Sequence, residues 1–447
     1  MTASRPPGAA TAEALLEALP EGEATIVRAL VDAAERDGVS LLAVGGPVRD
    51  LLLARPLRDV DLIVEPRGGA DAAQLARAAS LPGAQLLAHD RFGTLRVSTA
   101  EGTVDLATVR RETYAYPGAL PEVAPGTLED DLRRRDFTVN ALAIPLTAAA
   151  RDGRGEVVEA ERGLADLEAG VLRVLHPRSF HDDPTRALRA ARLAGRLGFT
   201  LSRSTRSALR DALRDGAFGR VSGDRLRREI EKLFEDASQG LDPSAALRLL
   251  SEWHVLAALE PGLTLPSETL APLRRLGRAI VQPPWPAPRA RPWAAGLAIW
   301  LAPLDAGLRG RALRRFAIRG SLADRIVGFP KARDAWLRGL GRARGRGAID
   351  AVLAGVGDEE ALALHAWASP TARRRVARHM LEDRPRRIPV TGDDLIALGL
   401  TGPAVGRALA RIRIAFLDGA VKDREDALAL ARELAGRRGG SRTRKTS

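Results

Sequence analysis

The chain has 447 residues, which is too long for a single hydrophobic core and predicts two to four domains. Hydrophobic residues make up 45% of it, but no apolar run approaches the roughly 18 residues of a membrane helix, and the absence of cysteine excludes disulfides and cysteine-ligated zinc. The net charge of +13 is uneven, because residues 1–100 hold 10 basic and 13 acidic residues whereas residues 101–447 hold 59 and 43.

This downstream basic excess favours a polyanionic partner such as nucleic acid. Only four of the 69 basic residues are lysines, however, and the coding composition of a genome can also produce such an arginine bias. The charge therefore gives only modest support to nucleic-acid binding.

The N-terminal pattern predicts two amphipathic helices over residues 11–37, separated at Pro20-Glu21-Gly22. An apolar strand, Leu41–Val44, follows and breaks at Gly45-Gly46. The two glycines let the backbone approach a ligand closely, and the helix that begins near Val48 presents free N–H groups to phosphate. Arg49 lies in the first turn of that helix as a candidate phosphate partner.

A second predicted strand, Asp59–Val64, carries two carboxylates in a D-x-D pattern. Because side chains alternate along a strand, Asp59 and Asp61 are expected on one face. Paired carboxylates suit Mg²⁺, which binds through one or two carboxylates together with substrate phosphates. Taken alone, such a pattern is more often a solvated strand face. The glycine turn and Arg49, which both precede this pattern, make a metal site the better interpretation.

The order G-G-x-V-R-D followed by D-x-D resembles the nucleotidyltransferase head of the class II tRNA CCA-adding enzymes and their relatives, the bacterial poly(A) polymerases. Further along the chain we predict a helix over Ala70–Ser80 and strands at Gln85–Leu87, Thr94–Ser98 and Gly102–Ala107. The resemblance makes Asp105, on the last of these strands, the candidate third carboxylate.

The resemblance also implies roles for a second block, Leu132–Leu142, which matches the R-R-D-x-x-x-N-A element of the family. Arg135 would contact the nucleotide triphosphate, while Asp136 and Asn140 would order the local backbone and the sugar. A helix N-cap would explain Asp136 equally well. The Pro/Gly-rich segment Tyr116–Pro121 looks like the flexible loop of the family.

The segment His176–Phe199 contains the element that resembles the family's base-recognition motif, E-D-x-x-R. Pro184 is expected to start a helix with Asp183 as its N-cap, and Arg186, Arg189 and Arg192 then fall at i, i+3 and i+6. In the family, the aspartate and the first arginine bond to the Watson–Crick edge of the incoming base. Asp182 stands where the family commonly has glutamate.

Downstream of Gly240 the pattern is helical, with breaks at Gln282–Pro292 and Gly341–Gly347, and Ile388–Asp423 resembles the tail of bacterial CCA enzymes. The predicted fold class is α+β, a small head with a mixed β-sheet followed by helical domains. We predict these boundaries: N-terminal extension 1–24, nucleotidyltransferase head 25–148, helical neck 149–238, helical body 239–380, helical tail 381–436 and disordered basic tail 437–447.

The resemblance implies template-independent addition of CMP and AMP from CTP and ATP to the 3′ end of tRNA, with Mg²⁺ as cofactor. An enzyme that adds only the terminal A stays an open alternative. The intact loop disfavours CC-only addition, and Arg91–Val97 lacks the arginine-rich signature of a poly(A) polymerase. A catalytically silent RNA-binding protein would be expected to lack one of the carboxylates.

The remaining expectations concern the setting of the protein. The first residues lack a secretory signal, so a cytoplasmic protein without a membrane anchor is expected. The three histidines after residue 200, at positions 254, 365 and 379, are too scattered for an additional metal phosphohydrolase domain. The sequence does not determine the oligomeric state.

Overall fold

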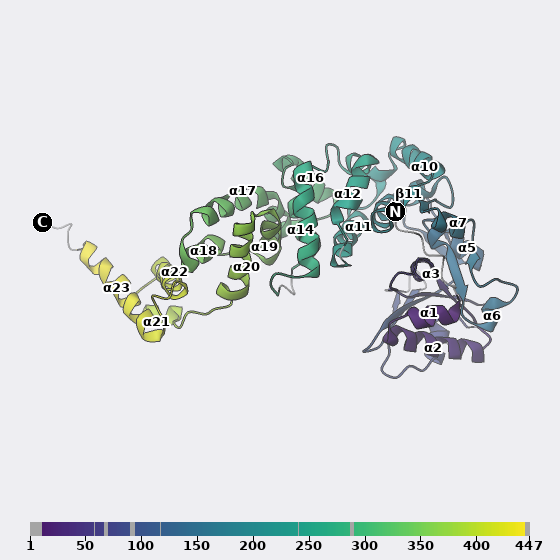
Figure 1. Cartoon of the computed structure of the whole chain (residues 1–447), viewed down its shortest axis with the longest axis horizontal. Coiled ribbons are helices and arrows are strands. Elements are labelled where there is room, and N and C mark those ends of the chain that lie inside the picture. The colour runs from purple at the N-terminus through teal and green to yellow at the C-terminus, as the bar shows by residue number, and fades with distance from the viewer. Residues whose placement is uncertain are drawn as a thin grey trace. The chain divides into compact units, whose positions relative to one another are not determined.

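The computed structural model describes residues 11–57, 59–66, 70–89, 94–116, 118–239, 241–286 and 290–442. Within it the chain forms two compact units (Figure 1). Residues 1–222 with 253–259 make the first unit, and residues 223–252 with 260–447 make the second. The division at Gly223 falls inside the range predicted for the neck, 149–238. The bounds of the six predicted segments stay predictions.

The first unit is built on a seven-stranded mixed sheet in the order β3-β4-β5-β2-β1-β8-β9. Strand β2 pairs in parallel with β5, and the other neighbours are antiparallel. Its strands are β1 Ser40–Val44, β2 Asp61–Glu65, β3 Gln85–His89, β4 Thr94–Ser98, β5 Thr103–Thr108, β8 Leu142–Pro145 and β9 Val158–Glu159. Two small two-stranded sheets pair β6 Arg110–Thr113 with β7 Glu122–Pro125 and β10 Val171–Leu172 with β11 Thr200–Leu201.

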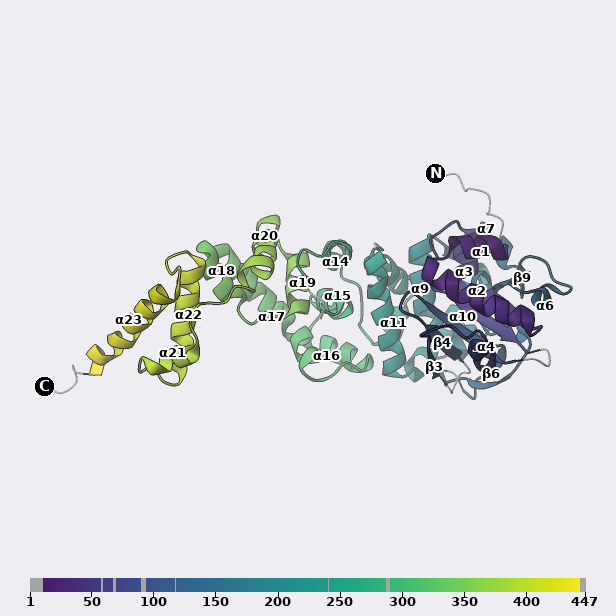
Figure 2. The ribbon, with the colours of Figure 1, turned by 90° about the horizontal axis from the view of Figure 1, so that it is seen from below.

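Helices and short 3₁₀ turns surround this sheet, and α2 and α4 pack on it (Figure 2). The helices of the first unit are α1 Ala12–Ala18, α2 Glu21–Arg36, α3 Gly46–Leu52, α4 Ala72–Ala78, α5 Leu128–Arg133, α6 Ala148–Arg151, α7 Gly163–Glu168, α8 Ser179–Asp182, α9 Arg186–Leu197, α10 Arg203–Arg214 and α13 Val255–Leu259, with 3₁₀ turns η2 Thr138–Asn140 and η3 Ala217–Arg220.

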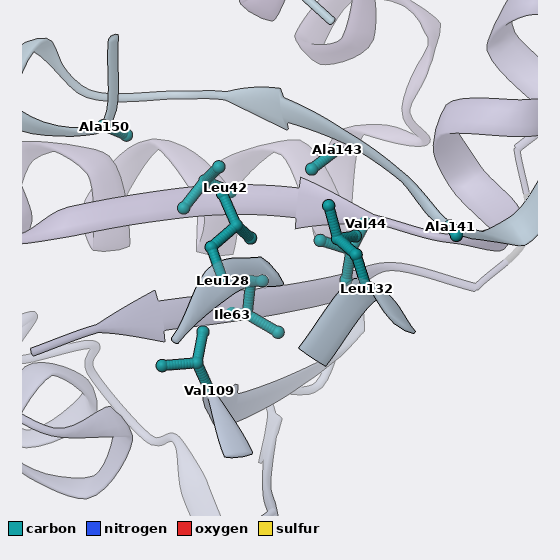
Figure 3. Packing of buried hydrophobic residues seen from close by; sticks show 9 residues of the cluster. All are labelled: Leu42, Val44, Ile63, Val109, Leu128, Leu132, Ala141, Ala143 and Ala150. Carbon is teal, nitrogen blue, oxygen red and sulfur yellow. The ribbon is translucent and has the colours of Figure 1, made fainter. Parts of the chain in front are cut away.

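One face of the sheet packs its apolar side chains against α5 (Figure 3). Leu42 of β1 and Ile63 of β2 point into this core, and Leu128 and Leu132 of α5 close it. Burial of each such side chain contributes about 1.5–3 kcal/mol. Because strand residues two apart share a face, Asp61 lies on the same face as Ile63, beyond the apolar core.

The second unit consists of helices in the part of the chain that the structure describes. They are α11 Gly223–Glu235, η4 Asp236–Gln239, α12 Pro243–Glu252, η5 Ser267–Thr269, α14 Leu270–Val281, α15 Pro292–Leu301, α16 Ala306–Arg315, α17 Gly320–Arg342, α18 Gly345–Leu353, α19 Asp358–Trp367, α20 Pro370–Arg378, a π-helical turn His379–Asp383, α21 Gly392–Ala397, α22 Pro403–Leu417 and α23 Arg424–Arg442. The two predicted breaks fall between α14 and α15 and between α17 and α18.

This arrangement confirms the predicted fold class of a mixed-sheet head followed by helical regions. Helix α23 continues to Arg442, so it enters the range 437–447 for which we predict disorder, and residues 443–447 lie outside the described residues. No helix in the described ranges is both long and apolar enough to cross a membrane.

Candidate active site

Two of the three candidate carboxylates lie side by side on adjacent strands. Asp61 opens β2 and pairs in register with Asp105 on the parallel strand β5. The expected strand Asp59–Val64 begins two residues late, so Asp59 precedes β2 and is exposed. Burial raises the pKa of Asp61, and the negative charges of Asp105 and Asp59 raise it further, whereas Arg135 lowers it. The three carboxylates are therefore electrostatically coupled.

Arg96 of β4 contacts this carboxylate group, which the sequence reasoning did not foresee. The antiparallel register of β4 and β5 places Arg96 opposite Asp105. Its guanidinium donates from Nε to Oδ1 of Asp105 and from Nη2 to Oδ2, both at 2.8 Å. The hydrogen bond and charge of Asp105 raise the pKa of Arg96, with smaller contributions from Asp59 and Asp61. Arg96 thus contacts Asp105 and lies within the electrostatic influence of Asp59 and Asp61.

The donor set of Asp59, Asp61 and Asp105 fits a divalent cation chemically. Carboxylate oxygens are the ligands that Mg²⁺ prefers, and a cation would neutralise the negative charge that these side chains bring together. Within the described ranges, no three His, Cys, Asp or Glu side chains are already arranged as a metal centre.

The glycine turn lies beside these carboxylates, at the end of β1. Gly45 has φ of 78°, which favours glycine, and a Cβ there would lie 2.7 Å from Nη1 of Arg135. Gly46 begins α3. The structure therefore brings Gly45, Gly46 and Arg135 together, as expected of a phosphate-binding corner.

Arg49, the other candidate phosphate partner, is 5% exposed and already bonded within the protein. Its Nη1 donates to Oδ1 of Asn140 at 2.5 Å and its Nε to Oδ1 of Asp50 at 2.9 Å. Burial lowers the pKa of Arg49, and the charge of Asp50 opposes this effect. In this structure the buried Arg49 holds Asn140 and Asp50 in place beside the glycine turn. Its contact with phosphate stays a prediction.

The side chain of Asn140 bonds to two neighbouring side chains, those of Arg49 and Asp136. Its Nδ2 donates to Oδ1 of Asp136 at 2.9 Å, and the same oxygen accepts the N–H of Phe137. Burial would raise the pKa of Asp136, but Arg189 and the hydrogen bonds of that carboxylate lower it. Asp136 is consequently an internal organising group, not the surface N-cap that we considered as an alternative.

Asp131 is a second organising carboxylate that sequence reasoning missed, although its i+3 and i+4 spacing to two arginines was a usable signal. It is fully buried, with Oδ1 2.6 Å from Nη2 of Arg134 and Oδ2 3.0 Å from Nη2 of Arg135. Burial would raise its pKa, but the charges of Arg135 and Arg134 lower it. Asp131 therefore fixes the orientation of Arg135.

Replacing Asp131 with alanine should destabilise the protein by about 3–5 kcal/mol, because it removes a fully buried carboxylate and takes its counter-charge away from the half-buried guanidinium groups of Arg134 and Arg135. Urea denaturation of the wild type and of Asp131→Ala would measure the loss. Asp130→Ala, which removes the neighbouring, half-buried acid from the same helix, is the matched comparison and loses a capping interaction worth about 1 kcal/mol. Equal losses in the two variants would contradict the buried role.

The candidate base-recognition residues lie between α8 and α9. Helix α9 begins at Arg186 rather than at Pro184, because the N–H groups of Arg186 and Ala187 bond three residues back in a tighter first turn. Asp183 ends α8 instead of capping α9, and its Oδ1 accepts from both the N–H and the hydroxyl of Thr185. The predicted N-cap is wrong for this reason, although Asp183 still orders the entry to the helix.

The three arginines of α9 differ in exposure. Arg186 is 2% exposed and donates from Nη1 to Oγ of Ser179 at 2.6 Å and from Nη2 to the carbonyl of Arg134 at 2.7 Å. Arg189 reaches Oδ2 of Asp136 at 3.3 Å and Oδ2 of Asp183 at 3.7 Å. Arg192 is half-buried. The structure brings Asp183, Arg186 and Arg189 together, and base reading stays a prediction.

The candidate flexible loop reaches the same region. The N–H of Gly118 donates to the carbonyl of His181 at 3.0 Å. The Tyr114 hydroxyl donates to Oε2 of Glu112 at 3.0 Å, and burial, followed by the charge of Glu112, raises the pKa of Tyr114 to about 12. Residue 117 of the loop, and residues 91–93 of the segment used to disfavour a poly(A) polymerase, lie outside the described residues.

Comparison with known proteins agrees with this geometry. A family model of the poly(A) polymerase head domain matches residues 41–173. An A-adding tRNA nucleotidyltransferase of Geobacter sulfurreducens is 32% identical over 93% of this chain, and the chain spans 48% of that relative's length. A CC-adding tRNA nucleotidyltransferase of Deinococcus radiodurans is 34% identical, over 89% of this chain and 90% of that protein.

A solved structure is also similar over nearly the whole length. It is an apo form of a CCA-adding enzyme with 30% sequence identity and a TM-score of 0.74, and the match covers 93% of this chain and 97% of that one. The predicted resemblance is thus confirmed in the head and beyond it. The chain belongs to the class II tRNA nucleotidyltransferase family.

Proposed function

We propose that this chain adds CMP and AMP from CTP and ATP to the 3′ end of tRNA, without a template and with Mg²⁺. The observation that carries the proposal is the in-register pair of Asp61 and Asp105, coupled to Asp59 and placed beside the Gly45–Gly46 turn. Structures similar to this chain have been solved with CTP, with ATP and with tRNA, which supports the same substrates here.

In this proposal Asp59 and Asp61 hold the metal and Asp105 assists on the side of the RNA. Nucleotidyltransferases of the family generally use a divalent metal, and Mg²⁺ is our assignment. When bound, the metal lowers the pKa of the RNA 3′-hydroxyl and neutralises charge on the phosphates. The 3′-hydroxyl would release its proton to water as its oxygen attacks the α-phosphorus, the bond from that phosphorus to the bridging oxygen of the β-phosphate would break, and pyrophosphate would leave.

The residues around the carboxylates bind and orient the nucleotide. The Gly45–Gly46 turn lies next to the guanidinium of Arg135, which would supply positive charge to the triphosphate. Asp183 and Arg186 would read the base edge, since a carboxylate offers only acceptors and a guanidinium only donors. Both are engaged with the protein in this structure, so base reading requires a change in their hydrogen-bond partners.

Addition of the terminal A alone is the second candidate, because the Geobacter relative that matches 93% of this chain is an A-adding enzyme. Two tRNA substrates separate the candidates. We expect a tRNA that ends at the discriminator base to be extended with CTP alone, and a tRNA that ends in CC to be extended with ATP alone. Extension of only the second tRNA would establish A-addition.

The second unit offers a surface for the tRNA backbone. A cavity of about 450 Å³ between α18 and α20 is lined by four arginines, Arg346, Arg374, Arg375 and Arg378. Arg346 is paired with Asp383 and Glu382, whereas Arg375 donates to the carbonyl of Ala343 and Arg374 is exposed. An arginine-lined cavity at the surface suits RNA phosphate.

tRNA affinity should therefore fall at least about tenfold between about 50 and about 200 mM salt, as expected for roughly two or more phosphate contacts. Arg374→Gln should make the slope of log Kd against log salt less steep by about one. Fluorescence anisotropy with labelled tRNA measures both effects. The equally exposed Arg314→Gln on α16 is the control, and an identical slope change in that variant would argue against the cavity.

A further inference from the structure

The guanidinium of Arg96 contacts Asp105, the third carboxylate of the candidate active site. Its two hydrogen bonds to Asp105 hold both carboxylate oxygens at 2.8 Å. The pair lies between neighbouring strands of the same sheet as Asp61, which is in register with Asp105 on the other side. Arg96 thus shares one face of the sheet with Asp105 and Asp61.

This contact is not needed to hold the fold together. The side chain of Arg96 is 49% exposed and that of Asp105 is 33% exposed, so the ion pair is partly solvated and contributes little to stability. Strands β4 and β5 are already joined by a five-residue ladder from Thr94↔Ala107 to Ser98↔Thr103. The contact between Arg96 and Asp105 is therefore better explained by a role in the candidate active site than by a role in the fold.

A divalent cation bound to Asp105 would lie within a few ångströms of the guanidinium. Like charges at that separation repel, and both compete for the same two oxygens. Metal and Arg96 consequently cannot both make their full contacts with Asp105. Because the Arg96 side chain is half-exposed at the end of a flexible stem, it can move away without disturbing the sheet.

We propose that Arg96 is a resident counter-cation of the metal-free site, which holds Asp105 until a divalent metal displaces it. The proposal rests on the proposed function, because it takes Asp105 as part of the metal-dependent centre. Arg96 is a positioning residue in this role: it keeps the three carboxylates from repelling one another before the metal arrives, and it raises the metal concentration needed to fill the site.

Removal of Arg96 should therefore tighten metal binding. Arg96→Gln should bind Mn²⁺ about threefold or more tightly than the wild type, the factor expected from loss of a partly exposed ion pair. Arg96→Lys keeps the charge but replaces two parallel hydrogen bonds with one point contact, so it should fall between the two. Electron paramagnetic resonance of free Mn²⁺ measures the affinity without nucleotide or turnover, and Mg²⁺ competition extends it to the proposed metal.

Arg77→Gln is the matched control. It removes one exposed positive charge from α4 and leaves the carboxylates untouched, so its Mn²⁺ affinity should equal that of the wild type. A second measurement is the melting temperature with and without Mn²⁺. The Arg96→Gln protein should gain more in melting temperature from Mn²⁺ than the wild type does, because it binds the metal more tightly.

Equal Mn²⁺ affinity in wild type and Arg96→Gln would overturn the proposal. Weaker affinity in the variant would also overturn it, since Arg96 would then hold Asp105 in its metal-binding position. Absence of Mn²⁺ binding in every variant would refute the metal assignment and this proposal with it. If instead the wild type binds Mn²⁺ and Arg96→Gln binds it equally well, this proposal fails but the proposed function stands.

Discussion

Asp61→Asn is expected to lower kcat for nucleotide addition by about a thousandfold or more while leaving tRNA affinity within about twofold of the wild type. Asparagine keeps the shape of the side chain but removes the negative charge that a metal needs. Asp61 lies at the start of β2, opposite Asp105, and no other residue described at that end of β2 carries a carboxylate. Single-turnover rates with α-labelled CTP at saturating Mg²⁺ would measure the loss.

Asp59→Asn should give a loss of similar size, which would show that the exposed carboxylate before the strand belongs to the same centre. Asp71→Asn is the matched control, because asparagine caps a helix as well as aspartate does and Asp71 lies at the start of α4. Near-normal turnover in Asp61→Asn would refute the assignment of this residue to the metal.

Asp183→Asn is expected to reduce the preference for CTP over UTP by roughly 5- to 150-fold, the range that corresponds to about 1–3 kcal/mol for an unpaired polar group. The change is chosen for its geometry. Asparagine retains an oxygen for the two Thr185 hydrogen bonds, but it turns the second oxygen, which lies 3.7 Å from Arg189, into a donor. The turn before α9 should survive while the acceptor pattern changes.

The kcat/KM values for all four nucleotides would measure this effect, and the melting temperature would confirm that the turn is intact. Asp182→Asn, one residue earlier, is the control and should retain the wild-type preference. An unchanged CTP-to-UTP ratio in Asp183→Asn would mean that another pair of side chains reads the base.

The sequence predicted the elements of the head well because their signals are local. Glycine turns and alternating apolar residues placed β1, α3 and β2 within two residues of where they lie, and helix breaks at Pro- and Gly-rich segments are equally local. The shift of β2 by two residues mattered, because it removed Asp59 from the strand that was to orient it. The charge of Asp59 still raises the pKa of Asp61, although Asp59 does not share a strand with it.

Features that depend on pairing between distant segments could not be predicted in the same way. Arg96 and Asp105 were both on predicted strands, but only the register of β4 with β5 makes them partners. The burial of Arg49 and Arg186 likewise depends on Asn140, Ser179 and the carbonyl of Arg134, which come from other segments. The spacing of arginines in a sequence predicts where positive charge lies. It does not predict which acceptors the fold places beside each guanidinium.

Sequencing of reaction products tests the proposed function most directly. Purified protein would be incubated with a tRNA that ends at the discriminator base, together with CTP, ATP and Mg²⁺, and the 3′ ends would be sequenced. Our account predicts that C, C and A are added in that order and that extension stops there. A tRNA left without added nucleotides, or one extended by a run of A, would contradict it.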